Sequence, residues 1–253
     1  MGGPGLGLAA EPALIPPSTE PGAVVAAAAR ALPWAASSFH VPPGSPPLGS
    51  LDLGAVLDRA AVRWPDVSPA VLATLWWYGS SSTLATVLVA QLAVTGRCVD
   101  PAHPSAVVTV GDTGTLASLG AAVTVDGPGA AAAFADVVDS LVGRVRDRVP
   151  SVSGASLWAI ASDSVANRAL DVATALNRVA DAPRWAQTLT AERRRHRFPQ
   201  PRFVDVSANG STRRFLRRSS CCRVVDAGED LCTSCPRRTP QDRAARWATL
   251  VGR

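Results

Sequence analysis

Apolar residues recur every three or four positions along most of the chain after position 50, as they do on the buried face of a helix. Pro65 ends the first such stretch, whose apolar residues are Leu53, Val56, Leu57, Ala60 and Ala61. Ser68 followed by Pro69 is typical of a helix start, because a serine side chain caps free backbone N–H groups and proline fits the first turn. A second helix is therefore predicted from position 69 towards position 94.

The next part of the chain changes from helical spacing to short β-branched segments. These segments cover residues 106–110, 115–119 and 121–125, and glycine-containing turns separate them. They predict a small β-meander or a pair of hairpins. Helical spacing returns at Gly129 and ends at Pro150.

Residues 151–181 then predict one long helix or two short ones, and the run 184–197 predicts a further helix that becomes very basic.

A charge-free run at residues 67–96 raises the question of a membrane span, because about 20 apolar residues suffice to cross a bilayer. The small polar residues 79–83 lie at the centre of this run. Trp76, Trp77 and Tyr78 also stand in the middle, whereas membrane helices place such residues at their ends. A buried core helix is the interpretation that fits.

The two ends of the chain differ from this middle part. Residues 1–50 are rich in Pro, Gly and Ala and predict a flexible or loosely packed arm, with Trp34 and Phe39 contacting the main domain. Residues 51–201 predict a helical domain with a small β-meander. Residues 202–253 predict a basic segment with a strand at 202–206 and a short helix at 241–250. The expected fold class is mainly α (α+β).

Charge is distributed unevenly along the chain. Residues 1–183 carry 9 Arg against 14 acidic residues, a net charge of −5, whereas residues 184–253 carry 16 Arg against 6, a net charge of +10. Every basic residue other than histidine is arginine. A basic end indicates an anionic partner, such as nucleic acid, an acidic protein, a membrane surface or a small anionic molecule.

Four of the five cysteines fall within fifteen positions, as Cys221-Cys222, nine residues, and Cys232-x-x-Cys235. The N-terminus lacks the pattern of an export signal, which favours metal ligation over disulfides for this group. The fifth cysteine, Cys98, ends an apolar stretch and is interpreted as a buried or half-buried thiol without a role.

Four thiolates can hold an iron–sulfur cluster or a zinc ion. Cys232 and Cys235 can share one metal, because a gap of two residues lets the chain turn around it. Adjacent cysteines do so poorly, since successive side chains point apart. The adjacent pair therefore favours a cluster, while zinc, disulfides and redox-active thiols stay open as alternatives.

The stretch from Arg217-Arg218 through Cys221-Cys222 to Cys232-Thr233-Ser234-Cys235-Pro236 resembles the C-terminal signature of the FhuF-like siderophore-iron reductases. That family has two arginines shortly before a cysteine pair, about ten residues, and then Cys-x-x-Cys. Residues 157–164 are similar to a Leu-Trp-Gly-Asn helix of the family, and residues 78–97 to an apolar helix that ends in Thr-Gly-Arg. The gap between the cysteine pairs is nine residues here.

The resemblance implies one [2Fe–2S] cluster bound by Cys221, Cys222, Cys232 and Cys235, and a cytoplasmic ferric siderophore reductase. Such a protein transfers one electron to Fe(III) held by a siderophore, of which the hydroxamate type is expected, and receives electrons from a donor such as a ferredoxin or a flavoprotein. One electron suffices for release, because Fe(II) binds hard oxygen donors far more weakly than Fe(III) does. No residue acting as acid, base or nucleophile is required.

Three arginines flank the cysteines and are candidates for tuning the cluster's potential or docking an anionic partner. They are Arg217, Arg218 and Arg223. The alternative is that they are solvated surface charges. The basic end could also hold the protein at the inner face of a membrane, where anionic lipids attract arginine.

Two other functions are compatible with the same residues. One is a zinc-stabilised, non-catalytic module that binds nucleic acid or protein, and the other is a [2Fe–2S] electron carrier of another pathway. The basic run 192–197 is interpreted as a solvated helix end and no nucleic-acid partner is expected, because no recognised nucleic-acid-binding spacing accompanies it.

Overall fold

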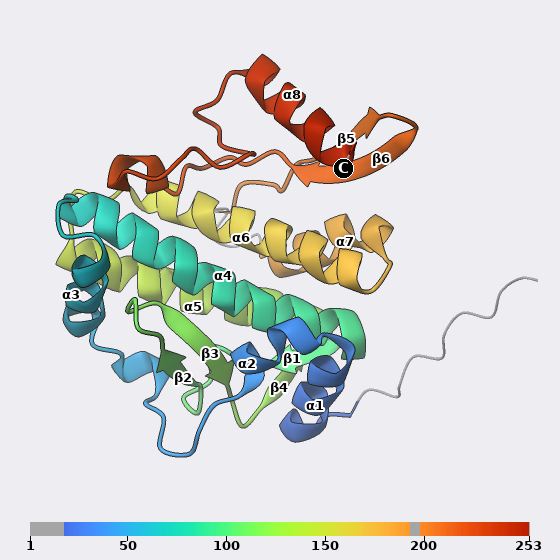
Figure 1. Cartoon of the computed structure of the whole chain (residues 1–253). Helices are drawn as coiled ribbons and strands as arrows, with labels where there is room; N and C mark the ends of the chain where they lie inside the picture. The colour runs from blue at the N-terminus through green and yellow to red at the C-terminus, as the bar shows by residue number, and fades with distance from the viewer. Residues whose placement is uncertain (1–17, 193–197, 253) are drawn as a thin grey trace, which may run out of the picture.

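The computed structural model describes residues 18–192 and 198–252. It is mainly helical with small antiparallel two-stranded sheets, which confirms the mainly α (α+β) fold class (Figure 1). The helices are α1 (Pro21–Ala31), α2 (Ala36–Phe39), α3 (Leu53–Arg63), α4 (Pro69–Thr95), α5 (Gly127–Arg148), α6 (Gly154–Ala175), α7 (Ala182–Leu189) and α8 (Pro240–Val251). Single 3-10 turns are η1 (Pro33–Ala35), η2 (Leu48–Ser50), η3 (Val179–Asp181) and η4 (Val224–Ala227).

Helix α4 forms the centre of the core and packs along α6, with α5 and α7 beside them (Figure 1). The Ser68 side chain accepts a hydrogen bond from the Val71 N–H and Pro69 occupies the first position, so the predicted helix start is confirmed. Trp76 and Trp77 are fully buried, and their indole N–H groups donate to backbone carbonyls. Burial on all sides explains a 27-residue helix without charged residues.

The candidate membrane helix is thus a core helix. In the described part of the chain, no helix has both the length and the apolarity needed to cross a membrane.

The strands form antiparallel pairs instead of one meander. They are β1 (Arg97–Val99), β2 (Val107–Val110), β3 (Leu116–Gly120), β4 (Thr124–Asp126), β5 (Phe203–Ala208) and β6 (Ser211–Leu216). Strands β2 and β3 pair as expected, but β4 leaves this hairpin and pairs with β1, which follows directly after α4. The outer edge of β2 is occupied by residues 46–48, whose backbone exchanges hydrogen bonds with Ala106 and Val108. The β1–β4 and β2–β3 sheets lie under α4, on the side away from α6 (Figure 1).

The expectation of a flexible arm at residues 1–50 is wrong for its described part, residues 18–50. Helix α1 packs against α4 and β1, and Ala28 and Leu32 are completely buried. Phe39 is buried as expected, whereas Trp34 is about half exposed. Alanine supplies little apolar area, but it lets α1 approach α4 closely, and this packing is not visible from the composition of the segment.

The C-terminal segment lies across α6 and α4 (Figure 1). The predicted strand at 202–206 is part of β5, and the predicted helix at 241–250 is α8. Strand β6 was not predicted. It follows a tight turn in which Asn209 and Gly210 both have positive φ, the conformation that an Asn-Gly pair favours. Of the basic run 192–197, residues 193–197 lie outside the described residues.

Candidate metal centre at the C-terminal cysteines

The four clustered cysteines lie between β6 and α8, in a segment with little regular structure. Cys222 and Cys235 are buried, Cys221 and Cys232 are half-buried, and all four thiols are free. The Sγ atoms of Cys221 and Cys235 are 3.9 Å apart, and Cys222 and Cys232 share a hydrogen bond. The structure therefore brings the four predicted ligands together as two pairs.

The pairing is crossed: the first cysteine meets the fourth, and the second meets the third. It differs from the interpretation in which Cys232 and Cys235 share one metal. A backbone hydrogen bond of 3.1 Å from the Cys235 N–H to the Cys232 carbonyl closes a turn between these two cysteines. Within residues 18–192 and 198–252, no group of three or more His, Cys, Asp or Glu side chains is arranged to hold a single metal ion.

Arg218 is the charged residue closest to these thiols and is only 5% exposed. One Nη atom lies 3.4 Å from the Cys232 Sγ and 3.7 Å from the Cys222 Sγ. The Nε atom lies 3.6 Å from a carboxylate oxygen of Asp163, and the guanidinium stands 5.1 Å from the centre of the Tyr78 ring. Burial alone lowers the pKa of Arg218, but the thiolate, phenol and carboxylate neighbours outweigh burial and raise this pKa, so the side chain stays positively charged.

The guanidinium of Arg218 is not fully satisfied by these neighbours. Its Nε and second Nη atoms are buried and have no hydrogen-bond partner. A buried N–H group without an acceptor costs about 1–3 kcal/mol, which makes this arrangement unusual in a folded protein. Two donor atoms of the guanidinium beside the thiols thus lack protein acceptors.

Asp163 holds the start of the cysteine segment on α6. Its carboxylate is 2% exposed and accepts hydrogen bonds from the backbone N–H and the hydroxyl of both Ser219 and Ser220, at 2.6–3.1 Å. Sequence reasoning gave Asp163 no role. The available signal was a lone carboxylate within an otherwise uncharged helical stretch, since a buried acid requires partners.

Helix α8 holds the other end of the segment. Arg243 is buried and donates to the Cys235 carbonyl at 3.2 Å, and the Arg238 Nε donates to the Cys232 carbonyl at 2.9 Å. The cysteine loop is therefore fixed from both sides, by α6 and by α8. These two arginines were not among the predicted residues, because their position in the sequence is that of ordinary helix-flanking charges.

The three predicted arginines have different positions. Arg218 reaches the thiols, as described. Arg223 has a left-handed backbone, with φ of 63°, and its N–H donates to the Cys221 Sγ at 3.3 Å while its side chain pairs with Asp226. Arg217 is exposed and contributes a backbone hydrogen bond to Arg202, so its side chain matches the solvated-charge alternative.

The thiols have unequal acidities. The hydrogen bond from Cys232, assisted by Arg218 despite the opposing effect of burial, lowers the pKa of Cys222 to about 5. The same hydrogen bond, together with burial, raises the pKa of Cys232. Burial raises the pKa of Cys221. Deprotonation is thus easier at Cys222 than at Cys232, and metal binding would release the protons of the thiols that are still protonated.

Cys98 is completely buried in the core, and burial raises the pKa of its thiol. This confirms the prediction of a buried thiol.

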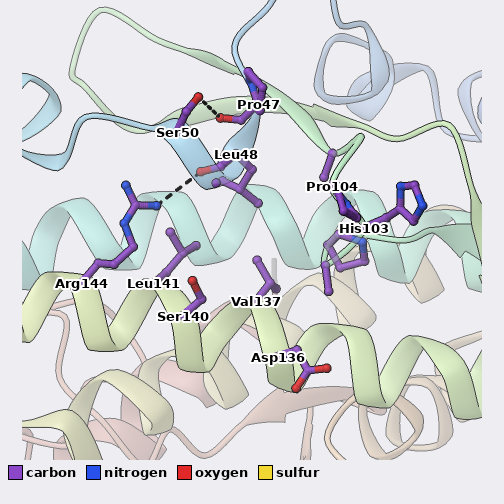
Figure 2. Close-up of a pocket in the computed structure, with 14 residues that line it drawn as sticks. Pro47, Leu48, Ser50, His103, Pro104, Asp136, Val137, Ser140, Leu141 and Arg144 are labelled. Atoms are coloured by element: carbon purple, nitrogen blue, oxygen red, sulfur yellow. Dashed lines mark hydrogen bonds between the residues drawn. The ribbon is translucent and has the colours of Figure 1, made fainter.

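Separate hollows lie on the surface of the described structure. One, of about 360 Å³, has Cys221 in its wall. Another, of about 430 Å³, lies between α5 and the turn at η2, far along the chain from the cysteines (Figure 2). Arg144 lines this second hollow and donates to the Leu48 and Leu51 carbonyls, and none of the cysteines lines it.

No protein-family model matches the chain, and none of the curated proteins matches it either. The resemblance to the FhuF-like reductases therefore stays a prediction that rests on the quoted residues.

Proposed function

We propose that the protein binds a [2Fe–2S] cluster with Cys221, Cys222, Cys232 and Cys235 and reduces siderophore-bound Fe(III) by one electron. The observation that carries the proposal is the arrangement of four free thiols as two pairs, one of which lies against a buried guanidinium. A [2Fe–2S] cluster takes two ligands on each iron, so two pairs fit it, whereas a structural zinc ion takes all four on one centre.

The polar groups around the thiols also fit such a cluster. One Nη atom of the buried Arg218 lies within 4 Å of the Cys222 and Cys232 Sγ atoms, and the sulfur atoms of a cluster accept hydrogen bonds. The single positive charge also offsets part of the negative charge that four thiolates introduce. Both features favour a cluster over a set of unrelated thiols.

The chain's residues have separate tasks in this mechanism. The cluster supplies one electron at a time when bound. Asp163 and Arg243 hold the two ends of the cysteine loop, and Arg218 stabilises added negative charge because its guanidinium lies within 4 Å of two sulfur atoms. No proton transfer to the substrate is needed, since the change of iron from Fe(III) to Fe(II) alone weakens its hold on oxygen donors.

The substrate class comes from the resemblance and not from the fold. We propose a ferric hydroxamate as substrate, a ferredoxin or a flavoprotein as donor, and a cytoplasmic site of action, with peripheral contact at the inner membrane face through the basic end of the chain. The net charge of +10 over residues 184–253 supports an anionic donor surface or an anionic lipid surface as partner.

The first test is whether the anaerobically purified protein holds the cluster. We expect visible absorption from sulfur-to-iron charge transfer, an EPR signal after one-electron reduction, and two iron and two sulfide per chain. Cys222→Ser should lose most of this absorption, whereas Cys98→Ala, which removes a buried thiol elsewhere, should keep it. A colourless protein with one zinc per chain would overturn the proposal in favour of the zinc-stabilised module.

The second test separates a siderophore reductase from an electron carrier of another pathway. Protein reduced under anaerobic conditions is mixed with a ferric trihydroxamate in the presence of a ferrous chelator. We expect reoxidation of the protein and formation of one ferrous complex per electron. Protein that holds the cluster but is not reoxidised would favour the carrier.

A further inference from the structure

The hollow of about 360 Å³ beside Cys221 lies where the cysteine segment meets the first turns of α4 and α6. Figure 1 shows η4 above these two helix ends. Thr74 comes from α4, Ser156 from α6, and Arg223 and Arg237 from the cysteine segment. One of the four proposed ligands thus forms part of a concave surface open to solvent.

Cys221 is the thiol through which an electron would leave most readily into this hollow. Cys222 and Cys235 are buried, and the half-buried Cys232 lies against Arg218 and does not line this hollow. Cys221 is half-buried and lines the hollow directly. A molecule seated there is separated from the cluster by a single ligand side chain.

The charges around the hollow suit a ligand with oxygen atoms on its surface. Arg223 and Arg237 both pair with Asp226, at 2.7 and 2.6 Å, which leaves one positive charge in excess over these three side chains. Ser156 on α6 adds a hydroxyl donor to the lining, whereas the Thr74 hydroxyl already donates to the Ala70 carbonyl. Hydroxamate oxygens share a negative charge even in a neutral ferric complex, and they accept hydrogen bonds from such groups.

The size of the hollow decides how much of the ligand it takes. At about 360 Å³ it lies near the lower end of small-molecule sites, which span roughly 300–1,000 Å³. It therefore accepts one face of a ferric trihydroxamate, the iron with its oxygen shell, and leaves the rest of the molecule in solvent. Loose enclosure also lets different trihydroxamates bind.

Two other hollows meet these conditions less well. The hollow of about 570 Å³ between α6 and the β5–β6 hairpin is lined by Ser234, next to Cys235, but by none of the four cysteines. The hollow in Figure 2 is remote from them in sequence and is lined by α5 and the η2 turn. Neither places a thiol in its wall.

We propose that the ferric chelate binds in the hollow lined by Cys221, Thr74, Ser156, Arg223 and Arg237, and that the electron reaches it past Cys221. This rests on the proposed function. One electron passes from the reduced cluster to the chelated Fe(III), which becomes Fe(II), and the oxidised cluster is reduced again by the one-electron donor. No covalent bond forms or breaks within the protein.

The test fills the hollow with a large side chain and compares this variant with one that carries the same change at a matched position. Ser156→Trp places an indole in the hollow from the exposed side of α6. Ser140→Trp makes the same change on the exposed side of α5, in the hollow of Figure 2. Binding is measured by calorimetry with the Ga(III) complex of a trihydroxamate, which cannot be reduced, and reoxidation is followed by stopped flow with the Fe(III) complex.

We expect Ser156→Trp to bind the Ga(III) complex with an affinity at least about tenfold lower, which corresponds to about 1.4 kcal/mol of binding free energy. The rate of electron transfer to the Fe(III) complex should fall by a similar factor. Its cluster content and reduction potential should equal those of the wild type, and Ser140→Trp should match the wild type throughout. Arg237→Gln, which leaves the Arg223–Asp226 pair in place, should weaken binding to a smaller extent.

A Ser156→Trp protein that binds Ga(III) chelate and reacts like the wild type would overturn the assignment of the hollow while the reductase function stands. Wild-type protein that holds the cluster but neither binds nor reduces the chelate would overturn both.

Discussion

Replacing Arg218 should lower the reduction potential of the proposed cluster. Reduction adds one negative charge, and the guanidinium stabilises it because one Nη atom lies 3.4 and 3.7 Å from two sulfur atoms. Arg218→Met removes the charge and keeps much of the volume of the side chain. Arg218→Lys keeps the charge but cannot donate to both sulfur atoms from one planar group.

The magnitude follows from Coulomb's law. A separation of about 5 Å between the guanidinium and the added charge, at an effective dielectric constant of about 20, gives about 3 kcal/mol. For a one-electron couple, a tenfold change in the equilibrium constant is about 59 mV, so this energy corresponds to about 130 mV. Water that enters beside the smaller side chain screens part of it, and we expect a fall of about 100 mV for Arg218→Met. Loss of one hydrogen bond of about 1 kcal/mol gives a fall of about 40 mV for Arg218→Lys.

The assay is a redox titration under anaerobic conditions, followed by visible absorption and by the EPR signal of the reduced state. Arg217→Met is the matched control, because this neighbouring arginine is exposed and its charge is screened by water and salt. Its potential should stay close to that of the wild type. An Arg218→Met protein with full cluster content and an unchanged or higher potential would refute the role of the guanidinium.

Three further results are expected from thermal or urea unfolding. Asp163→Ala removes the acceptor of the hydrogen bonds from Ser219 and Ser220 and leaves the buried Arg218 without its ion pair. The free energy of unfolding should therefore fall by about 3–5 kcal/mol, and the cluster content should fall with it. A free energy of unfolding equal to that of the wild type would contradict the anchoring role. Gly114→Ala should cost about 3 kcal/mol, since Gly114 has a φ of 77° and an added Cβ would collide with the Val56 carbonyl oxygen. The hydrogen bonds from Arg214 lower the pKa of Asp205. This pair therefore stabilises the fold above the ordinary carboxyl pKa of about 3.9, and its contribution is lost as the pH falls through the lowered pKa. The difference in free energy of unfolding between Asp205→Asn and the wild type should be present at pH 6 and disappear at low pH.

Much of the fold could be predicted because its signals are local. The cap and proline at Ser68 and Pro69 mark the start of α4, and apolar spacing marks α3, α5 and α8. The strand pairing could not be predicted in the same way. Nothing in residues 124–126 indicates that they pair with residues 97–99, because that choice depends on where the end of α4 lies in space. The packing of α1 was missed for a similar reason, since it depends on the shape of α4.

The candidate ligands could be read from the sequence, whereas the residues that position them could not. The spacing of four cysteines identifies them without knowledge of the fold, but the crossed pairing follows from the path of the loop between β6 and α8. Asp163 lies 56 residues before Ser219, so no local pattern connects them.

The positioning residues show why a segment of about twenty residues with four cysteines is attached to a large helical core. A buried cation beside thiolates is stable only where its own partners are also held, and here they come from two core helices: Tyr78 from α4 and Asp163 from α6. The segment itself supplies the sulfur atoms and one guanidinium, and the core supplies the fixed charge and the low exposure that make that guanidinium effective. A short peptide carrying residues 217–239 alone would keep the thiols but leave Arg218 in water, where screening would remove most of its effect on the potential. The uncharged surface of α4 and the buried acid Asp163 on α6 are therefore part of the candidate centre, although neither contributes a ligand.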